Sequence, residues 1–320
     1  MKGLWLENKH LSLRSDLAMP VLDEDEVLIK VRLAGICSTD LEIVRGYYPF
    51  TGIPGHEFTG VVVDANGSPQ LEGQRVIGDI NISCGNCEFC LREERSQCLA
   101  RRTLGIFDYN GVMAEYTKLP ARNLVVVPES VPDELAVFAE PAAAALRILE
   151  QVHVKPSDRV IVVGAGRLGL LIAQAFRNTG CELKVLVRRK KPAVFLSKLG
   201  IDSFLAQEAP SAWANIVVEA TGSLDGFSES LRLLKPRGTL VLKSTFAGKS
   251  QIDLSKLVVN EVTLIGSRCG NYRAGLRALA QRQIMIDGMI DSVFTLEEGL
   301  AAFERAAQPG VLKVLINPAS

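Results

Sequence analysis

The sequence predicts a two-domain α/β protein, in which a β-rich domain is combined with a parallel, doubly wound sheet. The chain has 320 residues, which is more than a single hydrophobic core usually supports. Its first part is punctuated by Gly, Pro, Asn and Ser and has few long helical patterns. From Arg159 onward, apolar strands alternate with helices, and this alternation is typical of a doubly wound sheet.

The β-rich part is indicated by short alternating segments. Residues 25–35 alternate apolar and polar side chains, which is the pattern of a half-buried strand. Residues 61–63 and 75–77 predict two further short strands. The character of the sequence changes near residue 131, where we expect one helix to begin at residues 132–134 and a second at residues 140–141.

The doubly wound part is indicated by a series of apolar strands. We expect these strands at residues 159–163, 183–187, 216–218, 239–242 and 262–265, with a helix at 168–177. A helix at 273–283 and a strand at 313–316 follow them. We therefore assign residues 143–270 to the doubly wound domain, and residues 1–142 together with 271–320 to the β-rich domain.

The charge balance argues against charged polymers as partners. The chain has 36 basic and 36 acidic side chains, so we expect neither a nucleic acid nor a membrane surface to bind it. Residues 1–10 lack the continuous apolar core of a signal peptide. The longest apolar runs, such as 168–176, are too short to span a bilayer. We therefore expect a cytoplasmic protein.

Four of the seven cysteines are closely spaced. Cys84, Cys87, Cys90 and Cys98 follow the pattern C-x2-C-x2-C-x7-C, and four thiolates with no open position describe a structural zinc site. The alternative is an iron–sulfur cluster, whose bacterial motif has its fourth cysteine after three residues and then a proline. Cys98 comes after seven residues and precedes Leu99. The spacing therefore favours a zinc ion that stabilises this segment.

A glycine-rich segment follows the strand predicted at 159–163. Its sequence, Gly-Ala-Gly-Arg-Leu-Gly, matches G-x-G-x-x-G, and the strand before it and the helix after it supply the context that this motif requires. The glycines let the backbone approach a pyrophosphate at the helix N-terminus, where free N–H groups favour anions. A chance glycine-rich turn is the alternative. The context favours a Rossmann domain whose cofactor loop contains Gly164, Gly166, Arg167, Leu168 and Gly169.

The strand predicted at 183–187 ends in a basic turn, Arg188-Arg189-Lys190-Lys191. NAD enzymes usually have Asp or Glu at this point, where it accepts hydrogen bonds from the ribose 2′-hydroxyl. A carboxylate would repel a 2′-phosphate, whereas a guanidinium pairs with it through charge-assisted hydrogen bonds. A solvated basic turn without function is the alternative. Since no carboxylate is present, Arg188 and Arg189 favour NADP over NAD.

A second set of potential metal ligands combines four different positions. Cys37 follows the strand predicted at 25–35, His56 and Glu57 stand in a Gly-His-Glu motif, and Glu140 precedes a proline at the domain junction. A zinc ion with three protein ligands and one open position, as in catalytic sites, requires a mixture of this kind. A lone cysteine or histidine would more often be a structural residue.

These motifs occur in the order found in the zinc-containing medium-chain alcohol and polyol dehydrogenases, and the sequence resembles that family over nearly the whole chain. The resemblance implies a GroES-like catalytic domain and a homodimer or homotetramer. It implies Cys37 and His56 as ligands of a catalytic zinc, with Glu57 as an alternating or direct ligand. Glu140 stands where classical alcohol dehydrogenases have a third cysteine, so either glutamate could be the direct ligand. The matching stretches are Gly-Ile-Cys-Ser-Thr-Asp, Gly-His-Glu-Phe-Thr-Gly-Val-Val, the four-cysteine segment, Glu-Pro-Ala-Ala-Ala-Ala-Leu, the glycine loop and Val-Val-Glu-Ala-Thr-Gly.

The implied activity is reversible hydride transfer between a small secondary alcohol or its ketone and NADP, with two zinc ions per chain. Thr39 is the expected carrier of the released proton, although a helix-capping hydroxyl explains it equally well by spacing alone. Arg268, at the end of the last strand of the cofactor domain, is a candidate for a pyrophosphate contact. The family often has a histidine five residues after the zinc cysteine, and Glu42 stands there instead.

Two other functions stay open at this point. One is a catalytically silent protein that binds zinc and NADP as a sensor, because fold and cofactor site do not guarantee chemistry. The other is an NADPH-dependent carbonyl or enone reductase without zinc chemistry, against which the presence of Cys37, His56 and Glu140 together argues.

Overall fold

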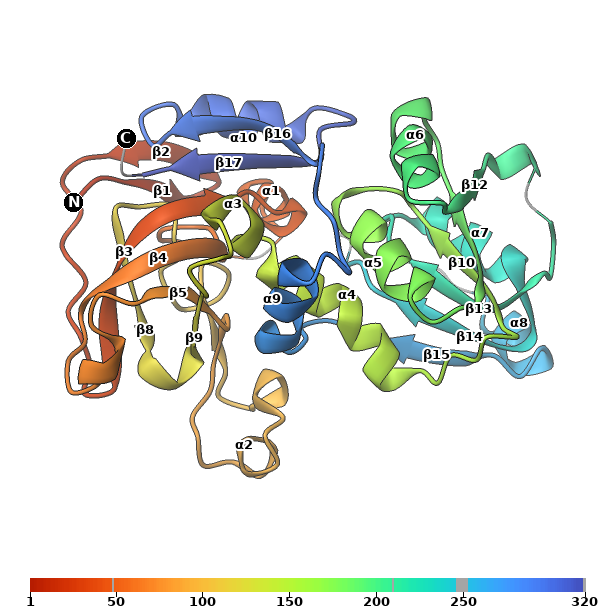
Figure 1. Cartoon of the computed structure of the whole chain (residues 1–320), viewed down its shortest axis with the longest axis horizontal. Helices are drawn as coiled ribbons and strands as arrows, with labels where there is room; N and C mark the ends of the chain where they lie inside the picture. Colours follow the sequence, from red (N-terminus) through yellow and green to blue (C-terminus); the bar gives the residue numbers. More distant parts are fainter. Residues whose placement is uncertain (48, 209, 246–252, 319–320) are drawn as a thin grey trace. The chain divides into compact units, whose positions relative to one another are not determined.

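The computed structural model describes residues 1–47, 49–208, 210–245 and 253–318. The chain divides into two compact units, Met1–Glu140 together with Met289–Ser320, and Pro141–Gly288. Each unit has its own sheet (Figure 1). Within the described ranges, none of the helices combines the length and the apolar composition needed to cross a membrane.

The first unit is built on a seven-stranded sheet in which most neighbouring strands are antiparallel. In spatial order its strands are β16 (Ile290–Thr295), β17 (Lys313–Asn317), β3 (Glu26–Gly35), β4 (Glu57–Asp64), β5 (Arg75–Gly78) and β9 (Leu124–Val126), with β8 (Tyr116–Pro120) paired to β3. Two small sheets pair β1 (Gly3–Glu7) with β2 (His10–Arg14), and β6 (Asn81–Ile82) with β7 (Arg102–Thr103). The expected β-rich character is confirmed.

Short helices connect these strands. In chain order they are α1 (Ser38–Val44), α2 (Glu88–Leu91), α3 (Asp133–Ala136) and α10 (Gly299–Ala307). The helix α1 follows β3 after two residues, and α3 begins within the segment where a helix was expected. The helix α10 lies between β16 and β17 in the chain and packs against both strands.

The long strand β3 positions the residues that follow it. Its apolar side chains are buried except for the half-buried Leu28, whereas Lys30 and Arg32 are exposed, as the alternating pattern predicts for these two positions. At the carboxyl end of the strand, Gly35 pairs with Glu57 on β4 on one side and with Leu315 on β17 on the other. Two segments that are far apart in the sequence therefore enclose the end of β3.

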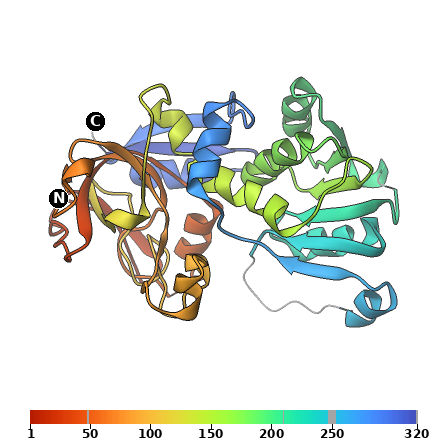
Figure 2. The same ribbon diagram turned by 60° about the horizontal axis from the view of Figure 1, so that its bottom comes forward.

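The second unit is a six-stranded sheet in which every pair of neighbouring strands is parallel. In spatial order the strands are β12 (Asp202–Phe204), β11 (Glu182–Leu186), β10 (Arg159–Val163), β13 (Ala214–Glu219), β14 (Leu234–Leu242) and β15 (Thr263–Gly266). Numbered along the chain, this order is 3-2-1-4-5-6, the order of the Rossmann fold. The predicted doubly wound sheet is confirmed, and Figure 2 shows its strands side by side.

The helices of the second unit pack against its sheet to different extents, and α8 has no buried residue. They are α4 (Ala139–Gln151), α5 (Arg167–Arg177), α6 (Lys190–Lys198), α7 (Leu224–Leu233), α8 (Leu254–Val259) and α9 (Tyr272–Ala280). The helix α5 packs on β10 and β11 through Leu171, Ile172 and Phe176, each at most 1% exposed. On the other face, Phe227 and Leu233 of α7 join the apolar core of the sheet.

The second domain boundary differs from the one expected. Residues 271–288, which the sequence led us to assign to the β-rich domain, belong to the second unit. One contact that ties this segment to the second unit is made by the buried side chain of Gln174 on α5, whose amide donates to the carbonyl of Met285 at 2.9 Å and whose oxygen accepts from the Met285 N–H at 2.7 Å. The first boundary lies at Glu140, two residues before the expected one.

Candidate metal centres and cofactor site

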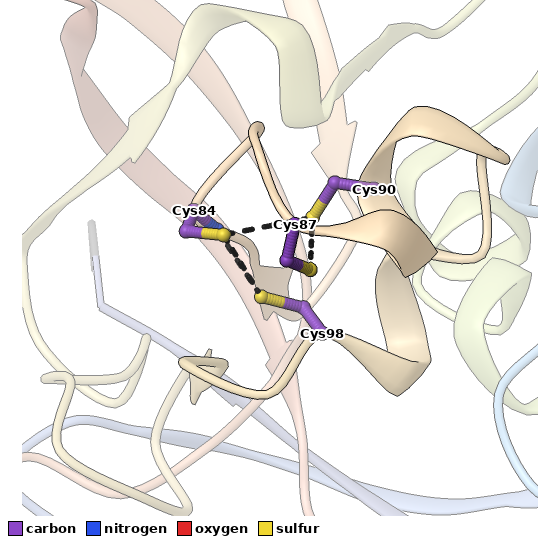
Figure 3. Close-up of side chains that lie close together, drawn as sticks. All are labelled: Cys84, Cys87, Cys90 and Cys98. Carbon is purple, nitrogen blue, oxygen red and sulfur yellow. Dashed lines mark hydrogen bonds between the residues drawn. The ribbon is translucent and has the colours of Figure 1, made fainter.

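Four thiols converge in the segment between β6 and β7 (Figure 3). Cys87 is the N-cap residue of α2 and Cys90 lies within that helix, whereas Cys84 and Cys98 flank it at a distance in the chain. The Sγ atoms of Cys84 and Cys98 are 3.5 Å apart, those of Cys87 and Cys90 are 3.5 Å apart, and those of Cys84 and Cys90 are 3.9 Å apart. All four sulfurs lie within 4.8 Å of one another.

These separations fit a single tetrahedral metal ion. Sulfurs at 2.3 Å from a zinc ion lie about 3.8 Å apart, whereas a disulfide would bring two of them to about 2.05 Å. The backbone N–H of Cys90 lowers the pKa of the Cys87 thiol to about 6, and burial raises the pKa of the Cys98 thiol to about 11. A metal ion bound here would displace the protons of such thiols, as zinc does at cysteine sites. The geometry and the donor set therefore fit a closed structural site.

A second group of potential ligands meets at the end of β3. Cys37 is the N-cap residue of α1, His56 immediately precedes β4, and Glu57 is the first residue of β4. One ligand atom from each of these three lies within 4.8 Å of the others. His56 and Glu57 are buried, and Cys37 is partly exposed. One sulfur, one nitrogen and one oxygen donor make up the three-ligand set typical of a catalytic zinc site.

Asp40 orients two of these ligands from the first turn of α1. Its Oδ1 lies 3.1 Å from Nδ1 of His56, and its Oδ2 accepts the backbone N–H of Cys37 at 2.7 Å. Burial alone would lower the pKa of His56, but the Asp40 carboxylate and the Cys37 thiol raise it well above its ordinary value. Because Nδ1 faces Asp40, Nε2 of His56 is the nitrogen left for a metal ion.

The two carboxylate oxygens of Glu57 differ in their surroundings. The Nζ atom of Lys313, on β17, donates to Oε2 and forms an ion pair with it. The other oxygen, Oε1, is buried and has no hydrogen-bond partner. An unpaired buried carboxylate oxygen is costly, and a bound cation would satisfy it. Lys313 is separated from Glu57 by 256 residues, and no motif in the sequence points to it.

Thr39 lies beside Cys37, the first of the three potential ligands along the chain. Its Oγ1 is 3.8 Å from Sγ of Cys37. The alternative explanation, in which Thr39 caps the helix, does not match the structure, because the reciprocal cap of α1 is made by Cys37 and Asp40. The Thr39 hydroxyl therefore lies beside the group formed by Cys37, His56 and Glu57.

Two further acidic residues were considered from the sequence. Among the described residues, Glu140 does not join the group formed by Cys37, His56 and Glu57, and it is the second residue of α4. Glu42, which stands where relatives often have a histidine, forms an ion pair with Arg45 at 2.6 Å. Of the two glutamates, Glu57 is the one whose ligand atom lies within 4.8 Å of those of Cys37 and His56.

The glycine loop between β10 and α5 uses each glycine differently. Gly164 has a φ of +106°, and a Cβ there would lie 2.8 Å from the Thr221 side chain. A Cβ on Gly169 would overlap the carbonyl oxygen of Gly164. Gly166 is the N-cap of α5 and has open space around its missing side chain. These are the roles expected of a loop that turns sharply, packs its helix closely and admits a pyrophosphate to the backbone.

The other predicted cofactor residues lie where strands of the same sheet end. Arg188 is exposed and follows β11 after one residue, Arg189 is the N-cap of α6, and Arg268 is exposed and follows β15 after one residue. Arg167 and Leu168 are the first two residues of α5. Ligands of open α/β sheets bind outside the carboxyl ends of the strands. All five residues therefore lie at the edge of the sheet where the cofactor is expected to bind.

Two buried charged residues at this edge were not singled out from the sequence. The Glu219 carboxylate, at the end of β13, accepts the backbone N–H groups of Thr221 at 2.6 Å and Gly222 at 3.2 Å. Lys243, directly after β14, donates to Oγ of Ser267 at 3.1 Å and to the carbonyl of Arg268 at 2.7 Å. These bonds fix the loops that leave β13 and β15.

Comparison with known proteins agrees with this arrangement. Residues 23–129 match the alcohol dehydrogenase GroES-like domain, and residues 134–317 match the glucose dehydrogenase C-terminus. The chain belongs to the zinc-dependent medium-chain dehydrogenase family. D-arabinitol dehydrogenase 1 of Uromyces fabae is 30% identical to it, over 94% of this chain and 92% of that protein.

Solved structures of this family have the same fold. A zinc-binding dehydrogenase from Sinorhizobium meliloti, bound to NADP, has a TM-score of 0.90 and 28% identity, and covers 99% of each chain. The alcohol dehydrogenase RspB of Escherichia coli CFT073, complexed with NADH, has a TM-score of 0.88 and 25% identity, and also covers 99% of each chain. The expected family and fold class are confirmed.

The different surroundings of Gly166 and Gly169 give a test of the cofactor loop. Gly166→Ala should leave the free energy of unfolding within about 0.5 kcal/mol of the wild type, because its Cβ meets no atom within 4 Å. It should raise the Kd for a nicotinamide dinucleotide roughly tenfold or more, equivalent to about 1.4 kcal/mol.

Gly169→Ala is the matched variant, and it should lower the free energy of unfolding because its Cβ has no room. Urea unfolding and fluorescence titration with the dinucleotide measure the two quantities. Unchanged dinucleotide affinity in Gly166→Ala would contradict the assignment of this loop.

Proposed function

We propose that this protein is a zinc-dependent dehydrogenase that oxidises a polyol or another small secondary alcohol with NADP, and catalyses the reverse reduction. The observation that carries the proposal is the meeting of Cys37, His56 and Glu57 at the end of β3, in a unit that also holds a closed four-cysteine site. A three-ligand set beside a separate four-ligand set is the combination of a catalytic and a structural zinc.

The reaction converts an alcohol to a carbonyl compound, with the hydride passed to the nicotinamide and one proton released. Zinc, when bound, supplies Lewis acidity toward the substrate oxygen. Asp40 holds Cys37 and the His56 ring in the orientation that presents their donor atoms together. The Thr39 hydroxyl accepts the substrate proton and passes it outward, since it lies next to the ligand group.

We assign Glu57 rather than Glu140 as the third protein ligand. Its carboxylate lies in the ligand group, and its Oε1 is buried without a hydrogen-bond partner. The substrate class is supported by the family and by the relative described as D-arabinitol dehydrogenase 1. The members that these comparisons name act on different compounds, so the particular alcohol is a matter for substrate screening.

NADP is the proposed cofactor. The turn after β11 contains Arg188 and Arg189, both exposed, and no carboxylate that would repel a 2′-phosphate. One structural relative binds NADP and another binds NADH, so the family alone leaves the choice open. The preference for NADP is therefore proposed from the composition of the turn after β11.

Metal analysis and turnover test the main proposal together. We expect two zinc ions per chain in the purified protein, and reduction of NADP in the presence of a panel of polyols and secondary alcohols. The variant Cys37→Ser should retain one zinc ion per chain and lose turnover by about a hundredfold or more, since metal chemistry contributes several kcal/mol. One zinc ion in the wild type, or no turnover at full occupancy, would contradict the proposal and favour a reductase without zinc chemistry or a silent sensor.

The cofactor preference has its own test. Arg188→Asp should lower the preference for NADP over NAD by roughly 10–100-fold, because a charge-assisted hydrogen bond contributes about 1.5–3 kcal/mol. Lys198→Asp is the control. Lys198 is exposed at the other end of α6, and this substitution alters the charge by the same amount but should leave the preference for NADP over NAD unaltered. The measurement is the ratio of the two Kd values, and an unchanged ratio in Arg188→Asp would contradict the assignment.

We also propose that two copies associate through the open edge of the second unit's sheet. In the described part of the chain, β15 is the last strand of that sheet. Unprotected sheet edges are rare in monomers, and exposed apolar groups beside them favour association. The exposed apolar residues on α8 and β15 are Leu254, Val258, Val259 and Leu264.

The mass in solution tests this association. Light scattering should give the wild type a mass of at least twice that of one chain, which is 34.7 kDa. Val258→Glu should reduce that mass by half or more, because a charge would be buried in the contact. Val21→Glu, a change at an equally exposed valine of the first unit, is the control. A wild type with the mass of one chain would contradict this part of the proposal.

A further inference from the structure

The ion pair between Lys313 and Glu57 is almost completely removed from solvent. The two side chains are 3% and 1% exposed, respectively. The Lys313 ammonium also lies 5.3 Å from the centroid of the Phe138 ring, which is itself fully buried. The lysine is therefore held between a carboxylate and an aromatic face, and has a defined position rather than a flexible one.

Stability alone does not account for this pair. Two buried charges lose their hydration, and this loss commonly offsets their attraction, so that apolar residues of similar size would serve the fold equally well. The pair lies instead at the carboxylate that completes the group with Cys37 and His56. Its position next to a candidate ligand indicates a role in the metal centre.

The surroundings of Glu57 make its two oxygens unequal. Oε2 is held by Lys313 from β17, and a Cβ on Gly35 of β3 would come within 2.6 Å of the same oxygen. Gly35 therefore packs closely against Oε2, and a side chain at position 35 would collide with it. Oε1 has no hydrogen-bond partner although it is buried. One oxygen is therefore occupied and enclosed, and the other is left for a cation.

We propose that Lys313 is the positioning residue of this metal centre: by holding Oε2 it restricts Glu57 to a single coordinating oxygen, Oε1. This proposal rests on the function proposed above. A carboxylate can bind a cation through one or both oxygens, as both modes are known for carboxylate ligands. With Oε2 held by Lys313, Glu57 would offer a zinc ion one oxygen, so that Cys37, His56 and Glu57 would supply three donors and leave a position for the substrate.

Cobalt substitution makes the coordination visible without any turnover. The absorption of Co²⁺ in the visible region is intense in a four-coordinate site and weaker in a five-coordinate one. The four-cysteine site also binds cobalt, so its contribution is subtracted with the variant Cys37→Ala/His56→Ala, which retains all four of its ligands. The remaining spectrum reports on the group that contains Glu57.

In Lys313→Met we expect both oxygens of Glu57 to reach the ion, and the visible absorption of this site to lose intensity. Lys313→Arg keeps a cation at Oε2 and should retain the intense spectrum. Glu57→Gln/Lys313→Met removes both charges and offers a single amide oxygen, so it should also retain the intense spectrum. This pattern over three variants separates restriction of the carboxylate from a general disturbance of the fold.

An intense, wild-type spectrum in Lys313→Met would overturn the proposal. If that variant does not fold, X-ray absorption of the zinc-loaded wild type decides, because the proposal requires one oxygen of Glu57 in a four-coordinate site and fails if two are found. Metal content distinguishes this failure from failure of the proposed function. Two ions per chain with an unaltered spectrum would overturn only the role of Lys313, whereas one ion per chain in the wild type would overturn both.

Discussion

The antiparallel pairing of β3 with β4 is the constraint on which the metal-ligand group depends. In an antiparallel pair the carboxyl end of one strand lies beside the amino end of the other. The pairing of Gly35 with Glu57 therefore brings the residue that follows β3 next to the residues that begin β4. Cys37 and His56 meet for this reason, and a one-residue change in register would turn the Glu57 side chain to the other face of the sheet. Asp40 then fixes both ligands from the first turn of α1.

Features formed by residues that lie close together in the sequence could be predicted from it. The four cysteines lie within one segment, and the glycine loop joins a strand directly to a helix, so local chain geometry determines both. The sulfur separations of 3.5–3.9 Å agree with the predicted four-thiolate site. The order of the parallel strands could also be expected, because the alternation of strands and helices restricts the possible topologies.

Features that depend on distant segments could not be predicted in this way. Lys313 looks like any polar residue at the start of an apolar strand, and only the pairing of β17 with β3 brings it to Glu57. The proposal of Glu57 rather than Glu140 as the third ligand rests on the closeness of Glu57 to Cys37 and His56, which no spacing rule supplies. The division of the chain after residue 288 rather than 270 could not be read from the helical pattern at 273–283, which does not reveal that Gln174 binds Met285.

The discontinuity of the first unit has a consequence for the order of events during synthesis. The second unit is one continuous segment, Pro141–Gly288, whereas the first requires residues from 289 onward. Domains commonly fold in the order in which they leave the ribosome, but here the N-terminal segment lacks β16 and β17 until the rest has been made. The nucleotide-binding unit can be complete first. The metal-ligand group acquires the partner of Glu57 only when β17 has joined β3, so this centre is among the last parts of the molecule to mature.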